Sequence, residues 1–212
     1  MKVVKASGSD DETYTEIDLG IEGLPNDIKR DIINEAGDFI VEKVLDSLAS
    51  AKSPVSGESF PALSKKYKAF KVAAGGEGVP NLELEGDLKA ALTYRPTDGG
   101  LEIGFFGDQA AKADGHLKFS GRENFTPKRR FLPEEGQQFK RDIIQGVEEI
   151  VDARAADAIK ESDLSGVESS SELYDVLGEI YVGYSRSDIR EIVSSNSNLM
   201  DLLIDLDLVR FL

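Results

Sequence analysis

The sequence predicts an α+β protein in which helical sections flank a β-like middle. Apolar residues recur every four positions over residues 23–51, and a second stripe of this kind covers residues 134–160. Between them, residues 81–107 carry alternating apolar positions and a turn signal. The 212 residues suit one medium domain, or one domain with an appendage.

The first helix is predicted over residues 23–51, after a short strand over residues 13–20. Pro25 suits the first turn, and Asn26 and Asp27 favour the same end through capping and the helix dipole. The apolar stripe consists of Ile28, Ile32, Ala36, Ile40, Val44 and Leu48, with Ile33, Val41 and Leu45 beside it. The spacing therefore predicts one long helix with a broad buried side.

The middle of the chain is predicted to be mostly β-structure and loop. Residues 53–61 form a loop, and residues 62–74 a short helix with Leu63, Tyr67 and Phe70 on one side. The apolar positions of residues 81–96 indicate β-structure, and residues 96–100 join that segment to an alternating strand, residues 99–107, as a hairpin. Residues 108–116 are expected to form a short helix or turn, and residues 117–133 a long loop or extended arm.

The C-terminal part is expected to be helical. A long helix is predicted from about Glu134 to Lys160, with Glu134 and Glu135 at its start. Short helices follow, with Ser171 and Glu172, and later Asn198 and Asp201, as start signals. The closing residues 199–212 are too apolar to stay solvated, so they are expected to bury against this chain or a neighbour.

Composition excludes several classes of function. The net charge is −15, which opposes diffuse binding to nucleic acid. The chain has no cysteine and one histidine, so disulfides, thiol catalysis and a multi-histidine metal site within one chain are excluded. The first residues do not resemble a signal peptide, and no apolar run is long enough to cross a membrane. We expect a protein made in the cytosol, with no membrane partner and no cofactor.

The charge is unevenly distributed along the chain. Residues 1–50 hold 5 basic and 12 acidic side chains, residues 51–133 hold 13 and 10, and residues 134–212 hold 7 and 18. A mildly basic middle is thus bracketed by acidic ends. This layout fits either solvated acidic helices or complementary surfaces used in assembly.

His116 is the one candidate for acid–base catalysis, with Asp114 nearby in sequence. No nucleophile motif accompanies the pair, and no calcium loop, P-loop or dinucleotide fingerprint is present. We therefore predict no catalytic site and no metal site, and interpret His116 as a structural residue.

The segment "PKRRFLP", residues 127–133, is the predicted interaction site. Three cations, Lys128, Arg129 and Arg130, directly precede Phe131 and Leu132. Arginine offers a rigid fork of donors to carboxylates, and arginine beside an aromatic residue is typical of protein interfaces. The alternative is local pairing with Glu134 and Glu135.

An ordered set of short motifs resembles the phage virion-morphogenesis or tail-completion proteins, which lie at the head–tail joint. The motifs are "GESFPALSKKYKAFK", "PNLELEGDLKAAL", "GLEIGFFG", "AAKADGHLKFSG" and "PKRRFLP". The matching residues are Gly57, Phe60, Pro61, Leu63, Tyr67, Lys71, Leu82, Gly86, Leu88, Gly104, Ala113, His116, Gly121, Pro127, Arg129, Arg130, Phe131 and Leu132. The resemblance covers residues 24–150, and it departs from the family at Lys112, where an aromatic residue is usual.

The resemblance implies an antiparallel, partly barrel-like sheet packed against a long helix. This domain would span residues 1–160, with a helical extension over residues 161–212. It also implies a structural protein of the virion neck. Copies would form a ring, commonly a hexamer, that contacts connector and tail proteins and leaves a passage for DNA without binding it specifically.

Two other interpretations stay open. The chain could serve as a head–tail adaptor or a tail terminator, because similar small α+β rings occupy those places. The other interpretation is a small hydrolase that uses His116.

Overall fold

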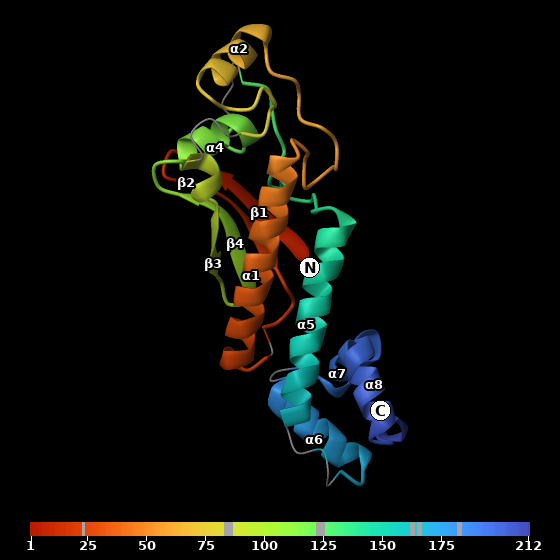
Figure 1. Ribbon diagram of the computed structural model, residues 1–212. Helices are drawn as coiled ribbons and strands as arrows, with labels where there is room; N and C mark the ends of the chain where they lie inside the picture. Colours follow the sequence, from red (N-terminus) through yellow and green to blue (C-terminus); the bar gives the residue numbers. More distant parts are fainter. Residues whose placement is uncertain (23, 83–86, 122–125, 162–163, 165–166, 182–183) are drawn as a thin grey trace.

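The structure is a computed structural model, and it describes residues 1–22, 24–82, 87–121, 126–161, 164, 167–181 and 184–212. Figure 1 shows an elongated molecule, with a sheet and two long helices in the middle. A small helical lobe lies at one end, and the C-terminal helices lie at the other. The α+β class predicted from the sequence is confirmed.

The sheet has four antiparallel strands in the order β1-β2-β4-β3: β1 (Lys2–Gly8), β2 (Glu12–Asp18), β3 (Thr93–Pro96) and β4 (Gly100–Phe106). The predicted hairpin is present, with Tyr94 opposite Ile103. Strands β1 and β3 are the two edges, so the sheet stays open. The sequence analysis missed β1, because only Val3 of this edge strand is buried and its apolar alternation is weak.

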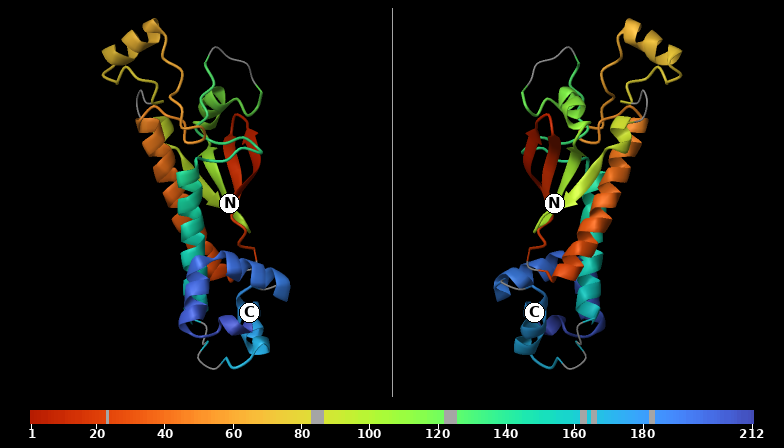
Figure 2. Two further views of the ribbon diagram at one scale, coloured as in Figure 1. Left: turned by 90° about the vertical axis from the view of Figure 1, so that its right-hand side faces the viewer. Right: turned by 90° about the vertical axis from the view of Figure 1, so that its left-hand side faces the viewer.

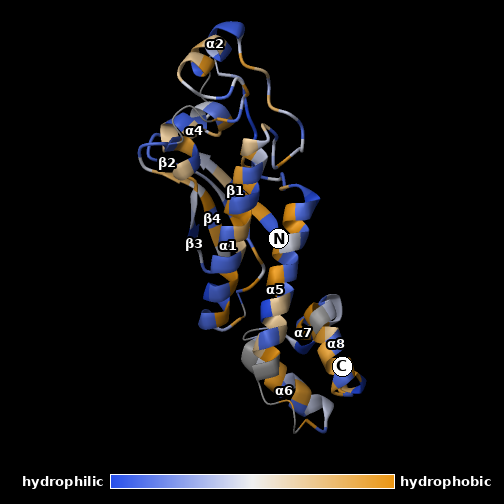
Figure 3. Cartoon of the chain, viewed as in Figure 1, coloured by the Kyte–Doolittle hydropathy of each residue, from blue (hydrophilic) through white to orange (hydrophobic). Residues whose placement is uncertain are grey.

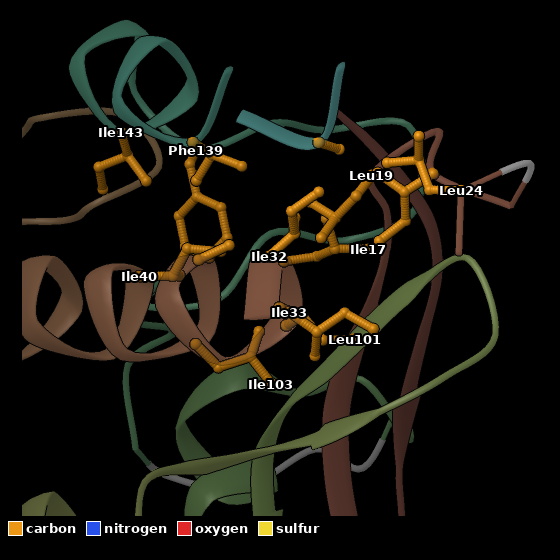
Figure 4. Close-up of a cluster of buried hydrophobic side chains, with 14 of the residues drawn as sticks. Ile17, Leu19, Leu24, Ile32, Ile33, Ile40, Leu101, Ile103, Phe139 and Ile143 are labelled. Atoms are coloured by element: carbon orange, nitrogen blue, oxygen red, sulfur yellow. The ribbon is translucent and has the colours of Figure 1, made fainter. Parts of the chain in front are cut away.

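Helix α1 (Asn26–Ala49) confirms the first long helix, and it packs on β3 and β4. Helix α5 (Arg141–Glu161) runs beside α1 (Figures 1 and 2). Figure 4 shows Ile32 and Ile40 of α1 directed at the core that Ile17 and Leu101 share with Ile143. This packing buries the predicted stripe and fixes one face of the sheet.

Helix α5 begins later than predicted, at Arg141 instead of about Glu134. Gly136 has a φ of 76°, which is a left-handed conformation that a helix cannot contain. The backbone N–H of Lys140 then donates to Pro54 O at 2.8 Å. Residues 134–140 therefore form a turn that ties the start of α5 to the loop after α1.

The shorter elements differ from the predictions in detail. Helices α2 (Lys65–Ala73) and α4 (Ala110–Leu117) are both present where expected. Instead of a continuous β-segment before β3, a single helical turn, α3 (Asp87–Ala90), buries Leu88. The predicted β-positions at residues 83–86 lie outside the described residues.

The C-terminal helices are α6 (Ser170–Ile180), α7 (Arg186–Ser195) and α8 (Ser197–Asp205), followed by the 3₁₀ turn η1 (Val209–Phe211). Helix α6 is capped at its N-terminus by Ser169, which forms a capping box with Glu172, and helix α8 is capped by Asn196. The predicted start signals at Ser171 and Asn198 were thus each displaced by two residues. Helix α8 packs on α5, so the proposed boundary at residue 160 separates segments that share one core. The two-part division stays a prediction.

Candidate functional site

The segment 127–133 lies in the body of the subunit and is not a free arm. The backbone N–H of Arg129 donates to His116 O at 2.9 Å. Ser53 Oγ donates to Arg130 O at 2.5 Å, and Thr15 Oγ1 donates to Pro133 O at 2.7 Å. These bonds anchor the segment to the end of α4, to the loop after α1 and to β2.

Phe131 and Leu132 are fully buried in the subunit's own core. The ring of Phe131 makes an edge-to-face contact with Phe105 of β4, with 5.8 Å between the ring centroids. This finding corrects the expectation that the two residues form an exposed apolar anchor. Their burial inside the subunit removes more apolar surface from water than a rim contact would.

Two of the three cations of the segment turn towards Glu134, and the third turns into the subunit. Lys128 Nζ donates to Glu134 Oε1, and Arg130 Nε lies 3.9 Å from the same oxygen. Local pairing, the alternative considered from the sequence, therefore accounts for Lys128. Arg130 is exposed, whereas Arg129 points inward. An interface role of Lys128 and Arg130 stays a prediction.

Arg129 is the unusual member of the site, because it is only 5% exposed. Its Nη1 lies 3.1 Å from His116 Nδ1, and its buried Nε has no hydrogen-bond partner among the residues that the structure describes. Burial lowers the pKa of Arg129, and among the described residues no carboxylate forms an ion pair with its guanidinium. An arginine stays protonated in proteins, so this is a buried positive charge without a negative partner.

His116 accepts the hydrogen bond from Arg129. Burial, helped by the charges of Arg129, Lys112 and Lys118, lowers the pKa of His116 to about 4. The imidazole is therefore neutral at pH 7, and Nδ1 accepts while Nε2 carries the proton. Asp114 instead accepts from the backbone N–H of Ser120 at 2.9 Å, so the structure does not pair it with His116.

A cleft of about 560 Å³ lies beside this pair. It separates the start of α2 from α4 and from residues 126–129. Its walls consist of Ala62, Leu63, Ser64, Tyr67, His116, Thr126, Pro127 and Arg129. The cleft thus brings together three motifs that are separate in the sequence, through Leu63 and Tyr67, His116, and Arg129.

Helix α2 and the C-terminal helices lie at opposite ends of the molecule (Figures 2 and 3), and each end exposes apolar side chains. The α2 lobe, residues 61–82, exposes Tyr67, Phe70, Val72 and Val79. The C-terminal surface, residues 201–210, exposes Ile204, Leu206 and Val209. These seven are the large hydrophobic residues that are exposed in the part of the chain that the structure describes.

The two groups carry opposite charge. Lys65, Lys66 and Lys68 are exposed on α2, where no acidic residue occurs. Asp201, Asp205 and Asp207 are exposed around the C-terminal surface, and Asp207 Oδ2 lies 2.9 Å from Arg210 Nη1. Residues 199–212 are expected to bury against this chain or a neighbour. Leu199, Leu203 and Leu208 are buried in this chain, and burial of the exposed group against a neighbour stays a prediction.

The sequence analysis missed the inward turn of Arg129. In an extended segment, alternate residues point to the same side. Arg129 lies two residues before the buried Phe131, but Leu132, two residues after Arg130, is equally buried. The segment also bends, because the backbone N–H of Phe131 donates to Arg129 O at 3.1 Å. Alternation therefore does not separate Arg129 from Arg130, and no local pattern of the sequence marks the inward turn.

No family model, no curated protein and no solved structure matches the chain. Within the described ranges, no group of three or more histidine, cysteine or acidic side chains could hold a metal ion. No helix in those ranges combines the length and apolar character that crossing a membrane requires.

Proposed function

We propose that this chain is a structural subunit of a tailed-phage neck. Copies of it form a ring, hexameric as in the family that its motifs resemble. The ring completes the tail and joins it to the head. It contacts connector and tail proteins, surrounds a passage for DNA and performs no catalysis.

The observation that carries the proposal is the pair of exposed surfaces at opposite ends of the molecule. The α2 lobe is apolar and basic, and the C-terminal surface is apolar and acidic. Two different complementary surfaces on one subunit allow head-to-tail contacts, which close into a ring when the rotation between neighbours permits it. A monomer would gain nothing from exposing aromatic residues such as Phe70, 57% of which faces solvent.

The net charge of −15 supports the DNA passage. Binding to the phosphate backbone requires cations, so an acidic lumen lets DNA pass without adhering.

Of the five residues predicted at the interface, Arg130 is the most exposed, with 50% of its side chain accessible against 35% for Lys128. Arg129 is buried, so reversing its charge would also disturb the fold. We therefore expect Arg130→Glu alone to weaken assembly while leaving the subunit folded.

The mass of the assembled protein tests the proposal. Native mass spectrometry should show a closed ring, and Phe70→Asp should shift it to monomers because it places a charge in the apolar contact. Ala111→Asp adds the same charge on the exposed side of α4 and is the matched control.

A map of the phage particle tests the location. The proposal expects the chain at the head–tail joint, on the tail side. If the map places the chain where a head–tail adaptor or a tail terminator lies, that alternative replaces the proposed function. A strictly monomeric protein that is absent from particles contradicts the proposal.

A further inference from the structure

We infer that the cleft beside Arg129 is a carboxylate-binding site. The ligand is a carboxylate group, supplied either by an acidic side chain of a second copy or by a small organic acid. If a second copy supplies the carboxylate, the inference rests on the proposed ring. If a small organic acid supplies it, the inference is independent of the proposed function.

The charge of the cleft requires an anion. Arg129 is nearly fully buried, and the imidazole of His116 that it contacts is neutral at pH 7. The electrostatic partners that shift His116 are Arg129, Lys112 and Lys118, all of them cationic. A buried charge without a counter-charge destabilises the folded state, and such groups are typical of functional sites, where a ligand can supply the missing charge.

Two described acidic side chains close in sequence to His116 and Arg129 are engaged elsewhere. Asp114, on the same helix as His116, accepts hydrogen bonds from the backbone and hydroxyl of Ser120. Glu134, close in sequence to Arg129, accepts from Lys128. The cleft therefore holds a cation whose partner comes from outside the described part of the subunit.

The form of the cleft favours a carboxylate on an aliphatic stem. Guanidinium N–H groups match the planar geometry of a carboxylate better than that of a spherical anion. The wall near the start of α2 carries Ala62, Leu63 and the ring of Tyr67, which suit methylene groups, and Pro127 adds an apolar group on the side of Arg129. Glutamate and aspartate side chains and short dicarboxylic acids share this chemistry, and the volume of about 560 Å³ admits any of them.

The chain reports on this site directly, because His116 is its only histidine. The imidazole gives one set of NMR signals, and its pKa responds to the charge on Arg129. We propose to follow these signals at pH 7 while titrating acetate and glutarate, with sodium chloride and sodium sulfate at matched ionic strength as comparisons.

The expected result is a saturable shift with acetate and glutarate, with a Kd in the millimolar range that is typical of a single ionic contact. At saturation, the pKa of His116 should rise from about 4, because the carboxylate offsets the Arg129 charge. Arg129→Gln should abolish the saturable shift. Arg130→Gln, which removes the adjacent exposed charge, should leave it unchanged.

A second variant guards against misfolding. If Arg129→Gln fails to fold, Arg129→Lys keeps the charge but loses the fork, and it should weaken glutarate binding at least several-fold. Absence of any saturable shift in the folded wild type overturns the inference. A shift produced by sulfate and not by carboxylates overturns it as well.

Protein concentration separates the two sources. If a neighbour's acidic side chain fills the cleft, the His116 signal shifts on concentrating the protein without added acid, and glutarate competes with that shift. If a small acid is the ligand, the signal is independent of protein concentration. If a ring assembles while neither glutarate nor a rise in protein concentration shifts the His116 signal, the inference alone is wrong. If the protein stays monomeric and binds glutarate, the proposed ring alone is wrong.

Discussion

Helices α1 and α2 have similar apolar stripes in the sequence but opposite fates in the structure. The stripe of α1 is buried, with Ile32, Ile40 and Val44 inaccessible to solvent. The stripe of α2 is exposed: 43% of Tyr67 and 57% of Phe70 face solvent. The difference separates the part of the chain that makes the core from the part that presents a surface.

The α2 lobe is held by polar contacts instead of an apolar core. Ser64 caps α2 by accepting from the backbone N–H of Tyr67, and Lys71 Nζ donates to Val79 O at 2.9 Å. A lobe ordered in this way can expose aromatic residues without unfolding. The comparison teaches that an apolar stripe indicates which side of a helix is buried, but not whether the subunit or a neighbour buries it.

Replacing one aromatic residue by alanine in the core and one in the α2 lobe should give the largest difference in unfolding free energy between the two regions. Phe131→Ala should lower the free energy of unfolding by about 3–5 kcal/mol, because it leaves a cavity against Phe105. Phe70→Ala should change the free energy of unfolding of the monomer by less than about 0.5 kcal/mol. Chemical denaturation monitored by circular dichroism measures both. Equal costs would show that the lobe belongs to the core.

The buried end of the cleft should make stability depend on pH. The pKa of His116 is about 4 in the folded state and near 6.5 when unfolded, so the unfolded chain binds the extra proton first. The contribution of neutral, buried His116 to the free energy of unfolding is complete above about pH 6.5. It is lost as the pH falls towards 4, and its size is on the order of 2–3 kcal/mol.

The variant His116→Gln isolates this contribution, because acidic groups titrate in both proteins. As the pH falls from 6.5 to 4, the free energy of unfolding of the wild type should fall by about 2–3 kcal/mol more than that of the variant. A constant difference across that range would show that His116 titrates normally and is not buried.

Two glycines provide a smaller test. Gly37 of α1 faces the ring of Tyr94, and an added Cβ would lie 2.7 Å from ring atoms, so Gly37→Ala should cost about 1–3 kcal/mol. Gly178 of α6 has open space, so Gly178→Ala should stabilise by up to about 1 kcal/mol. Thermal unfolding of both variants checks the signs. Tolerance of alanine at Gly37 would contradict the close packing of α1 on β3.

Sequence reasoning found the elements whose pattern is set by local burial. The recurrence of Ile32, Ala36 and Ile40 predicted α1, and the alternation of Leu101 and Ile103 predicted β4. It failed where tertiary contacts decide the outcome. Nothing local shows that Gly136 adopts a left-handed conformation and delays α5, or that β1 pairs with β2 as an edge.

The candidate site shows the same limit. The sequence drew attention to residues 128–132, but only the fold separates buried Arg129 and Phe131 from exposed Arg130. The cleft brings Leu63 together with His116 and Arg129, which follow it by 53 and 66 positions in the chain. Their meeting depends on how α2 and α4 are placed, and no short motif encodes that.

The most direct test of the account is a charge exchange between the two exposed surfaces. One variant carries Lys65→Glu, Lys66→Glu and Lys68→Glu, and the other carries Asp201→Lys and Asp205→Lys. Sedimentation velocity should show each variant alone as a monomer and their equimolar mixture as a larger assembly, because mixing restores opposite charges across every second contact and leaves the others native. If each variant alone assembles as the wild type does, or if the mixture stays monomeric under conditions in which the wild type assembles, the two surfaces do not bind each other.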